Sequence, residues 1–278
     1  MSIRSSIKIV LVIALVLLLL VALAWIFQRQ LIYLPNAAAP PGDQRPTSAI
    51  DVTLETDDGL RLTAWLVHPT GDDRGMAVLV APGNAGNRAG RADIGRRLAA
   101  EGFTVLLLDY RGYGGNPGSP DETGLRHDAL AAWRYLNEEA GFDGDQMIYF
   151  GESLGGGVVS HLATVRPPAA MLLRSPFTDL AAAGQRAFPF LPVRALLRDR
   201  FPVAEDVVAA GVPLTVVIGT EDSIIPPQQS RDVAASAADA GAVVTIVEIT
   251  ADHNDAELAH GPEVIQAVVD LANHCGGC

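Results

Sequence analysis

One serine in this sequence stands in a pattern that is typical of a catalytic nucleophile. Residues 147–157 read Met-Ile-Tyr-Phe-Gly-Glu-Ser-Leu-Gly-Gly-Gly, so an apolar run leads into Gly-x-Ser-x-Gly and then into a helix-forming stretch. A serine at such a sharp strand-to-helix turn is held with its hydroxyl exposed, and Gly151 and Gly155 are needed where strand and helix nearly touch. We therefore predict that Ser153 is a nucleophile. The alternative is a serine that only caps the start of a helix.

A serine hydroxyl is a weak nucleophile near neutral pH, so it needs a base, and that base needs an orienting acid. In parallel sheets both lie in loops at the carboxyl ends of strands, and they follow the serine in the order acid, then base. Asp222 follows the apolar run 213–219, and His253 follows the run 243–249. We predict Asp222 as the acid and His253 as the base. Glu221 and Asp179 are alternatives for the acid.

The oxyanion that forms during acyl transfer needs N–H donors, each commonly contributing about 2.7–4 kcal/mol. The main-chain N–H of Leu154 is one candidate, because it follows the nucleophile at a helix N-terminus. The turn 82–87, Pro-Gly-Asn-Ala-Gly-Asn, follows another apolar run, and its glycines allow close approach of the backbone to a ligand. We predict the Asn84 N–H as the second donor. The alternative is that these glycines only form a tight turn.

The elements that must position these residues follow from the pattern of apolar runs. Short runs alternate with longer helical patterns over residues 49–274, which predicts an α/β domain with a mostly parallel, doubly wound sheet. Runs 52–55 and 60–67 flank Asp57-Asp58-Gly59 and predict an opening hairpin. The stretch 178–211 breaks the alternation with aromatic residues beside prolines. It is expected to form a short cap, or alternatively an ordinary pair of amphipathic helices.

The first 30 residues differ in character from the rest. Between Lys8 and Gln28 no side chain is charged or strongly polar. At about 1.5 Å per residue, a helix of this length crosses the hydrocarbon core of a bilayer. We predict one N-terminal transmembrane helix, within residues 1–30, that serves as a retained anchor. Trp25, Phe27 and Tyr33 are expected at the membrane interface, where aromatic rings are favoured.

The charges around this segment predict its orientation. Arg4, Lys8 and the amino terminus precede it, which places the N-terminus in the cytoplasm and the large domain outside. The alternative is a secretory signal that is cleaved near Ala24, which gives a secreted protein. Residues 31–48 are rich in proline and alanine and are expected to form an extended linker.

Composition excludes several classes of function. The net charge of −12 argues against nucleic acid as a partner. Lys8 is the one lysine, so the domain has neither a Schiff-base lysine nor a Walker-type phosphate loop. No cofactor or metal is implied. Cys275 and Cys278 form a Cys-Gly-Gly-Cys tail, which we interpret as frayed with an incidental or local disulfide, because a redox or metal site needs a nearby cation or more ligands.

Together these motifs resemble the α/β-hydrolase superfamily over about residues 31–272. The resemblance rests on five segments: Gly-Glu-Ser-Leu-Gly-Gly (151–156), Leu-Asp-Tyr-Arg-Gly-Tyr-Gly-Gly (108–115), Ser-Pro-Phe-Thr-Asp-Leu (175–180), Gly-Thr-Glu-Asp (219–222) and His-Asn-Asp (253–255). With Leu-Ile-Tyr-Leu-Pro (31–35) after an apolar helix, the chain is similar to a single-pass, N-terminally anchored subgroup. Members of that subgroup cleave acyl esters and thioesters, including lysophospholipids and palmitoylated proteins. One departure is Pro82, which stands where this subgroup usually has histidine.

The resemblance implies a serine hydrolase that cleaves acyl esters or thioesters through Ser153, Asp222 and His253, with a lipid-like substrate favoured by the anchor. A serine peptidase that acts on short peptides is the alternative, because it uses the same acyl transfer. A third interpretation is a catalytically silent hydrolase fold that serves as a binding module.

Overall fold

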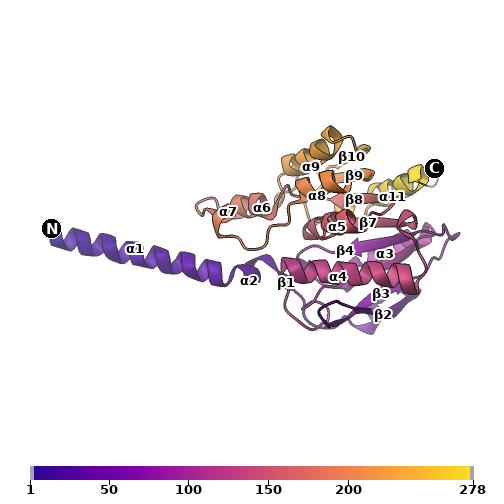
Figure 1. Ribbon diagram of the computed structural model, residues 1–278, viewed down its shortest axis with the longest axis horizontal. Coiled ribbons are helices and arrows are strands. Elements are labelled where there is room, and N and C mark those ends of the chain that lie inside the picture. Colours follow the sequence, from indigo (N-terminus) through magenta and orange to yellow (C-terminus); the bar gives the residue numbers. More distant parts are fainter. Residues whose placement is uncertain (1–2, 276–278) are drawn as a thin grey trace.

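The computed structural model describes residues 3–275 and has an eight-stranded sheet at its centre, with one long helix projecting from the domain (Figure 1). The strand order is β10-β9-β8-β7-β4-β6-β3-β2. Strands β2 and β3 form an antiparallel hairpin and β3 is antiparallel to β6, whereas the other neighbours are parallel. The strands are β2 (Ala49–Glu55), β3 (Arg61–Val67), β4 (Ala77–Ala81), β6 (Thr104–Leu107), β7 (Met147–Glu152), β8 (Ala170–Arg174), β9 (Leu214–Gly219) and β10 (Val244–Ile249). The predicted mostly parallel α/β sheet is confirmed.

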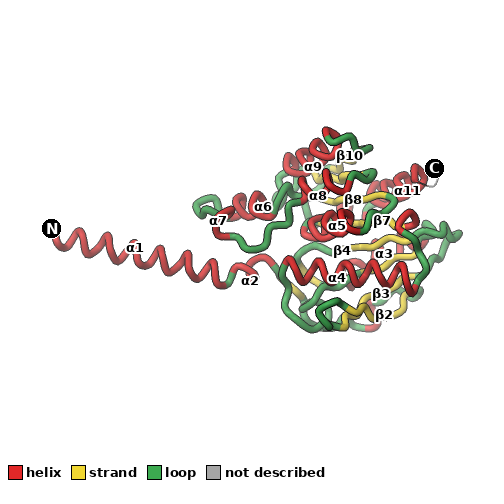
Figure 2. Tube along the Cα trace, in the orientation of Figure 1, coloured by secondary structure: helices red, strands yellow, loops and turns green. Residues whose placement is uncertain are grey.

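Helices cover both faces of this sheet (Figure 2). Successive side chains of a strand point to opposite faces, so the central strands divide their apolar residues between two cores. On β4, Leu79 contributes to one core and Val78 to the other. The first core is covered by α4 (Glu122–Arg134), α5 (Leu154–Val165), α8 (Val203–Ala210) and α9 (Pro227–Asp239). The second is covered by α3 (Ala92–Ala100), α10 (Ala256–His260) and α11 (Pro262–Cys275).

The predicted opening hairpin is present, and a second turn is braced by Asp109. The hairpin turns at Gly59, whose φ of +85° is readily adopted only without a side chain. Asp109, which follows β6, braces the turn 110–115. Its carboxylate accepts a hydrogen bond from Arg88 at 2.6 Å, and its carbonyl accepts one from Asn116. The side chain and the carbonyl of Asp109 therefore both fix the turn 110–115 at the end of β6.

The N-terminal helix α1 (Ile3–Ile26) contains a stretch, Ser6–Ile26, that is long and apolar enough to cross a membrane. Within the described residues it is the one such helix, and none of its most apolar window is buried in the protein. It is followed by α2 (Gln28–Ile32) and by β1 (Leu34–Pro35), which pairs in parallel with β5 (Ala85–Gly86). The stretch that the sequence predicts as a linker thus hydrogen-bonds to the domain. Tyr33 is 3% exposed, so its predicted place at the interface is wrong.

The stretch 178–211 contains α6 (Leu180–Ala187), α7 (Val193–Leu196) and α8. Helix α8 buries Val203 and Val207 in the first core and packs beside α5. Helices α6 and α7 leave the sheet and lie over its carboxyl end, on the side from which α1 projects (Figure 1). We refer to residues 178–202 as the cap.

Candidate active site

Ser153 lies at the turn between β7 and α5, with φ +50° and ψ −110°. A positive φ is strained for a residue with a side chain, and this strain is the form expected of a serine presented at a strand-to-helix turn. The flanking residues Gly151 and Gly155 must be glycine because a side chain at either position would collide with neighbouring backbone. A Cβ on Gly151 would lie 2.7 Å from the Cα of Gly156, and a Cβ on Gly155 would collide with the carbonyl oxygen of Ala81.

Asp222 and His253 lie in the loops after β9 and β10, as predicted. The Nδ1 atom of His253 lies 2.7 Å from Oδ2 of Asp222, and both residues are buried, at 6% and 7% exposure. The other carboxylate oxygen accepts hydrogen bonds from the main-chain N–H groups of Ile224 and Ile225, at 3.0 and 2.7 Å. Burial alone would raise the pKa of Asp222, but the hydrogen bond to His253 and these N–H donors hold it below its ordinary value. The Asp222 carboxyl is therefore ionised at neutral pH and holds the His253 ring through this hydrogen bond.

The alternative acids lie elsewhere. Glu221 is exposed. Asp179 accepts a hydrogen bond from the Ala182 N–H at 2.8 Å, so it caps α6, and it also pairs with Arg194 in the cap. Neither carboxylate is bonded to His253 by the described hydrogen bonds, whereas Asp222 is.

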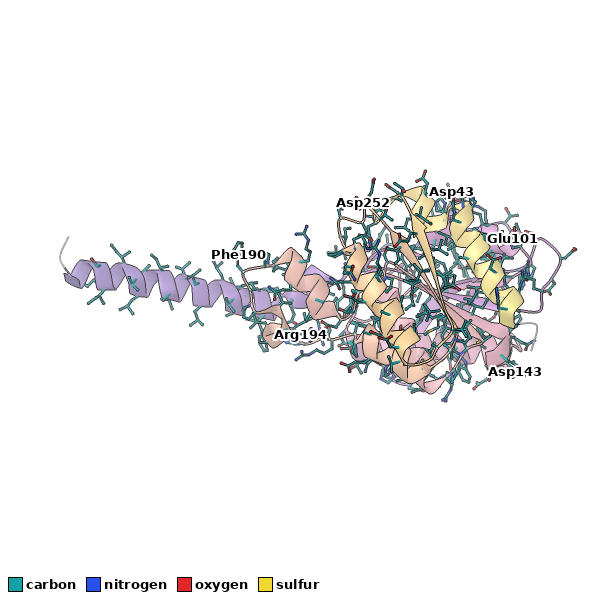
Figure 3. All side chains as sticks on the ribbon, turned by 90° about the horizontal axis from the view of Figure 1, so that it is seen from above. Asp43, Glu101, Asp143, Phe190, Arg194 and Asp252 are labelled. Atoms are coloured by element: carbon teal, nitrogen blue, oxygen red, sulfur yellow. The ribbon has the colours of Figure 1, made fainter. Side chains whose placement is uncertain are left out.

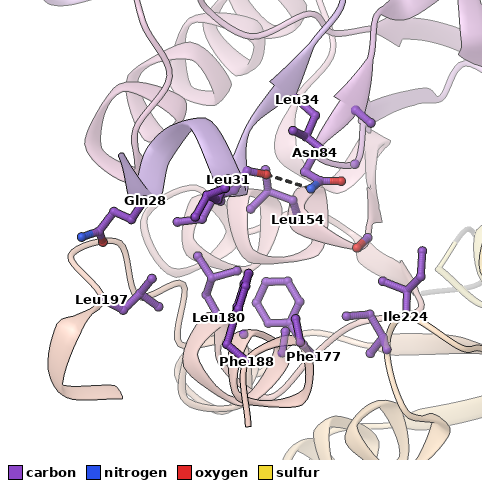
Figure 4. Close-up of a pocket in the computed structure, with 18 of the residues that line it drawn as sticks. Gln28, Leu31, Leu34, Asn84, Leu154, Phe177, Leu180, Phe188, Leu197 and Ile224 are labelled. Atoms are coloured by element: carbon purple, nitrogen blue, oxygen red, sulfur yellow. Dashed lines mark hydrogen bonds between the residues drawn. The ribbon is translucent and has the colours of Figure 1, made fainter. Parts of the chain in front are cut away.

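The residues predicted to stabilise the oxyanion, Leu154 and Asn84, come from two elements and line the same cavity as Ser153. Leu154 is the first residue of α5, and the first N–H groups of a helix have no partner within it. Asn84 lies in the turn after β4, and its carbonyl accepts hydrogen bonds from the Leu34 N–H and the Tyr113 hydroxyl, both at 2.8 Å. Its side-chain amide donates to the carbonyl of Ile32 at 2.8 Å (Figure 4). The turn is therefore fixed on both sides.

Ser153, Leu154, Asn84 and His253 all line one cavity of about 540 Å³. This volume is in the range of small-molecule sites, which are mostly apolar with a few polar groups. Most of the remaining wall is apolar and comes from three places (Figure 4). The end of α1 and α2 contribute one side, the cap contributes the opposite side, and Ile224 and Ile225 contribute the rim beside Asp222.

The sequence did not reveal an ionic cluster next to the serine, of which Glu152 and Arg91 line the same cavity. Glu152 is bound by Arg91 through two hydrogen bonds, of 2.7 and 3.1 Å, and by Arg174 at 2.8 Å. Arg174 is 1% exposed and also donates to the carbonyl of His253 at 2.7 Å. Burial alone would raise the pKa of Glu152, but the two guanidinium groups lower it to about 2. The cluster therefore links the serine turn to the histidine loop.

The site and its surroundings offer little for metal binding. Over residues 3–275, no group of three or more His, Cys, Asp or Glu side chains is placed to hold a metal ion. Cys278 and the side chain of Cys275 lie outside the described residues, so the predicted local disulfide stays a prediction.

Comparison with known proteins agrees with the fold. A sequence model of the alpha/beta hydrolase fold matches residues 77–190. The chain is 42% identical to the uncharacterised protein Rv2307c of Mycobacterium tuberculosis, over 95% of this chain and 93% of that protein. It is 26% identical to the lysophosphatidylserine lipase ABHD12 of Danio rerio, over 73% of this chain and 64% of that protein. Among solved structures, the esterase Pf2001 of Pyrococcus furiosus superposes with a TM-score of 0.70 at 18% identity, over 87% of this chain and 97% of that one.

Proposed function

Because this chain belongs to the α/β-hydrolase family, we propose that it is a serine hydrolase that cleaves acyl esters or thioesters at a membrane surface. The observation that carries the proposal is the arrangement around one cavity. Ser153 has the strained backbone of a nucleophile turn, and His253 is held by Asp222 at 2.7 Å on the wall of the same cavity.

The reaction follows from these positions. Ser153 Oγ attacks the acyl carbonyl while His253 removes its proton, and the ionised Asp222 keeps Nδ1 protonated so that Nε2 is the base. The N–H groups of Leu154 and Asn84 stabilise the oxyanion. The histidine then protonates the leaving alcohol or thiol. Water activated by the same histidine hydrolyses the acyl-enzyme and releases the carboxylic acid.

The apolar wall of the cavity supports an acyl chain as the group that is recognised. We place the N-terminus in the cytoplasm and the catalytic domain on the outer side, with α1 as a retained single-pass anchor. The name of the Danio rerio relative, a lysophosphatidylserine lipase, supports an ester of a lipid as the substrate class.

The test is labelling of the detergent-solubilised full chain with a fluorophosphonate, which reacts with activated serines. Labelling that is lost in Ser153→Ala and kept in Ser119→Ala, a change at an exposed serine, supports the proposal. Rates on acyl esters, acyl thioesters and aminoacyl amides then separate an esterase from a peptidase. A folded wild-type chain that takes no label would instead favour a binding module.

A further inference from the structure

The end of the membrane helix is part of the wall of the catalytic cavity. Ala24 and Trp25 from the last turn of α1, and Leu31 from α2, line the same cavity as Ser153. The opposite wall is formed by the cap, with Phe188 and Leu197 facing this side (Figure 4). The cavity thus lies between the cap on one side and the junction of α1 with α2 on the other.

The cap is fixed to this point by polar bonds. Arg29 binds both carboxylate oxygens of Asp199, at 3.2 and 3.0 Å, and the hydroxyl of Tyr33 donates to the same carboxylate at 2.8 Å. Gln28 accepts a hydrogen bond from the Arg198 N–H at 2.8 Å, and the Arg198 guanidinium lies 3.8 Å from the ring centroid of Trp25. Asp199 and Tyr33 are each 3% exposed, so the hydrogen bond between them is shielded from water and joins the cap to the segment that follows α1.

The tip of the cap, residues 188–191, exposes aromatic side chains on the side of α1. Phe190 is 98% exposed and Phe188 is 46% exposed. In Figure 1 the cap extends along the direction of α1, to one side of it, and Figure 3 shows Phe190 level with the last part of that helix. Ser6–Ile26, at about 1.5 Å per residue, spans about 30 Å, so the membrane surface falls near Ile26 and the tip lies at that surface.

The charges of the cap fit the same surface. Although the chain has a net charge of −12, the cap carries the exposed Arg186, Arg198 and Arg200, besides Arg194, which is paired with Asp179. Phenylalanine beside arginine is the composition of elements that insert at a bilayer interface and contact anionic head groups. A water-facing loop gains nothing from an exposed Phe190, whereas an inserted one removes that ring from water.

We propose that the tip of the cap inserts into the leaflet in which α1 ends, and that the cavity takes its acyl substrate directly from that leaflet. This rests on the proposed hydrolase activity and on α1 as a membrane helix. The acyl chain then moves from the lipid into the apolar cavity between α2 and the cap without crossing water.

Depth of insertion tests the first half of the proposal. The full chain, with Cys275 and Cys278 replaced by serine, carries Phe190→Cys labelled with the fluorophore NBD in vesicles of phosphatidylcholine and phosphatidylglycerol. We expect emission at shorter wavelength than from Val243→Cys, a matched control at an apolar residue that is 72% exposed, and quenching by spin-labelled lipid. Emission equal to the control overturns insertion. A shift without quenching by the lipid label also overturns it, because the tip is then covered by protein.

Turnover tests the second half. Phe190→Ser and Val243→Ser are compared in the same vesicles on water-soluble p-nitrophenyl butyrate and on p-nitrophenyl palmitate dissolved in the bilayer. Phe190 does not line the cavity, so we expect the butyrate rate to stay unchanged in both variants. The palmitate rate should fall about ten-fold in Phe190→Ser alone, the loss that corresponds to exposing one phenylalanine. An unchanged palmitate rate, with the butyrate activity intact, overturns entry from the leaflet and leaves the hydrolase proposal standing. Ser153→Ala tests the hydrolase proposal separately, because it should abolish the turnover of both esters. Butyrate and palmitate turnover that persists in Ser153→Ala would overturn the hydrolase proposal itself.

Discussion

Replacement of Glu152 by glutamine should destabilise the domain in a way that depends on pH. The carboxyl has an ordinary pKa of 4.5, and Arg91 and Arg174 lower it to about 2 in the folded protein. A depressed carboxyl pKa contributes stability that is complete above 4.5 and is lost as the pH falls from 4.5 to about 2. The difference corresponds to about 3 kcal/mol at neutral pH. Glu152→Gln should remove that amount at pH 7, and progressively less below pH 4.5.

The assay is thermal unfolding of the full chain in detergent, followed by circular dichroism, at pH 7 and at about pH 3. For a domain of this size about 3 kcal/mol corresponds to a fall in Tm of about 6–12 °C. Glu248→Gln is the matched control, because Glu248 also binds an arginine at 2.8 Å but is 43% exposed. An exposed pair contributes about 0–1 kcal/mol. Equal losses in both variants, or a Glu152→Gln deficit that is as large at about pH 3 as at pH 7, would refute this partly buried ionic cluster as a source of stability.

Three further outcomes follow from named contacts. Asp222→Asn should lower turnover by about ten-thousand-fold, because a neutral amide no longer selects the His253 tautomer, while the circular dichroism spectrum stays unchanged. Asp206→Asn should raise the free energy of unfolding at pH 7 by about 1 kcal/mol, measured by urea unfolding. Burial raises the pKa of Asp206 to about 6, so at pH 7 the folded protein must hold an unfavourable buried charge that asparagine does not carry. The gain should vanish near pH 4, where the carboxyl of the folded protein is neutral. Tyr33→Phe should cost about 1–3 kcal/mol in the same assay, because it removes a donor from the buried Asp199, and an unchanged midpoint would contradict the role of this bond.

The sheet, its helices and the residues around the cavity were predictable because each rests on a local pattern. Buried parallel strands produce continuous apolar runs, and the turns after them carry the polar residues of a site at the carboxyl edge. The hairpin was predictable for a similar reason, since Gly59 marks its turn. The roles of Ser153, Asp222 and His253 stay predictions until labelling and turnover are measured.

What the sequence did not predict depends on contacts between distant residues. Strands β1 and β5 have two residues each, too short for any period to be visible. Tyr33 follows an apolar helix, as interfacial aromatic residues do, but its partner Asp199 lies 166 positions away. Glu152 occupies a variable position of its motif, and its partners Arg91 and Arg174 come from two other elements. None of these pairings leaves a signal in the local pattern.

The turn 82–87, which is predicted to hold the oxyanion, is fixed by contacts of the same long-range kind. Pro82 stands where the anchored subgroup usually has a histidine, yet its carbonyl accepts a hydrogen bond from Tyr110 at 2.9 Å. The next fixed point is Asn84, which is bonded to Tyr113 and to the backbone of residues 32 and 34. Two of these supports come from the segment that follows the apolar helix α1. That segment therefore supports the turn at Asn84, and a version of the chain that begins after residue 34 lacks both one side of the cavity and the Leu34 N–H that binds Asn84.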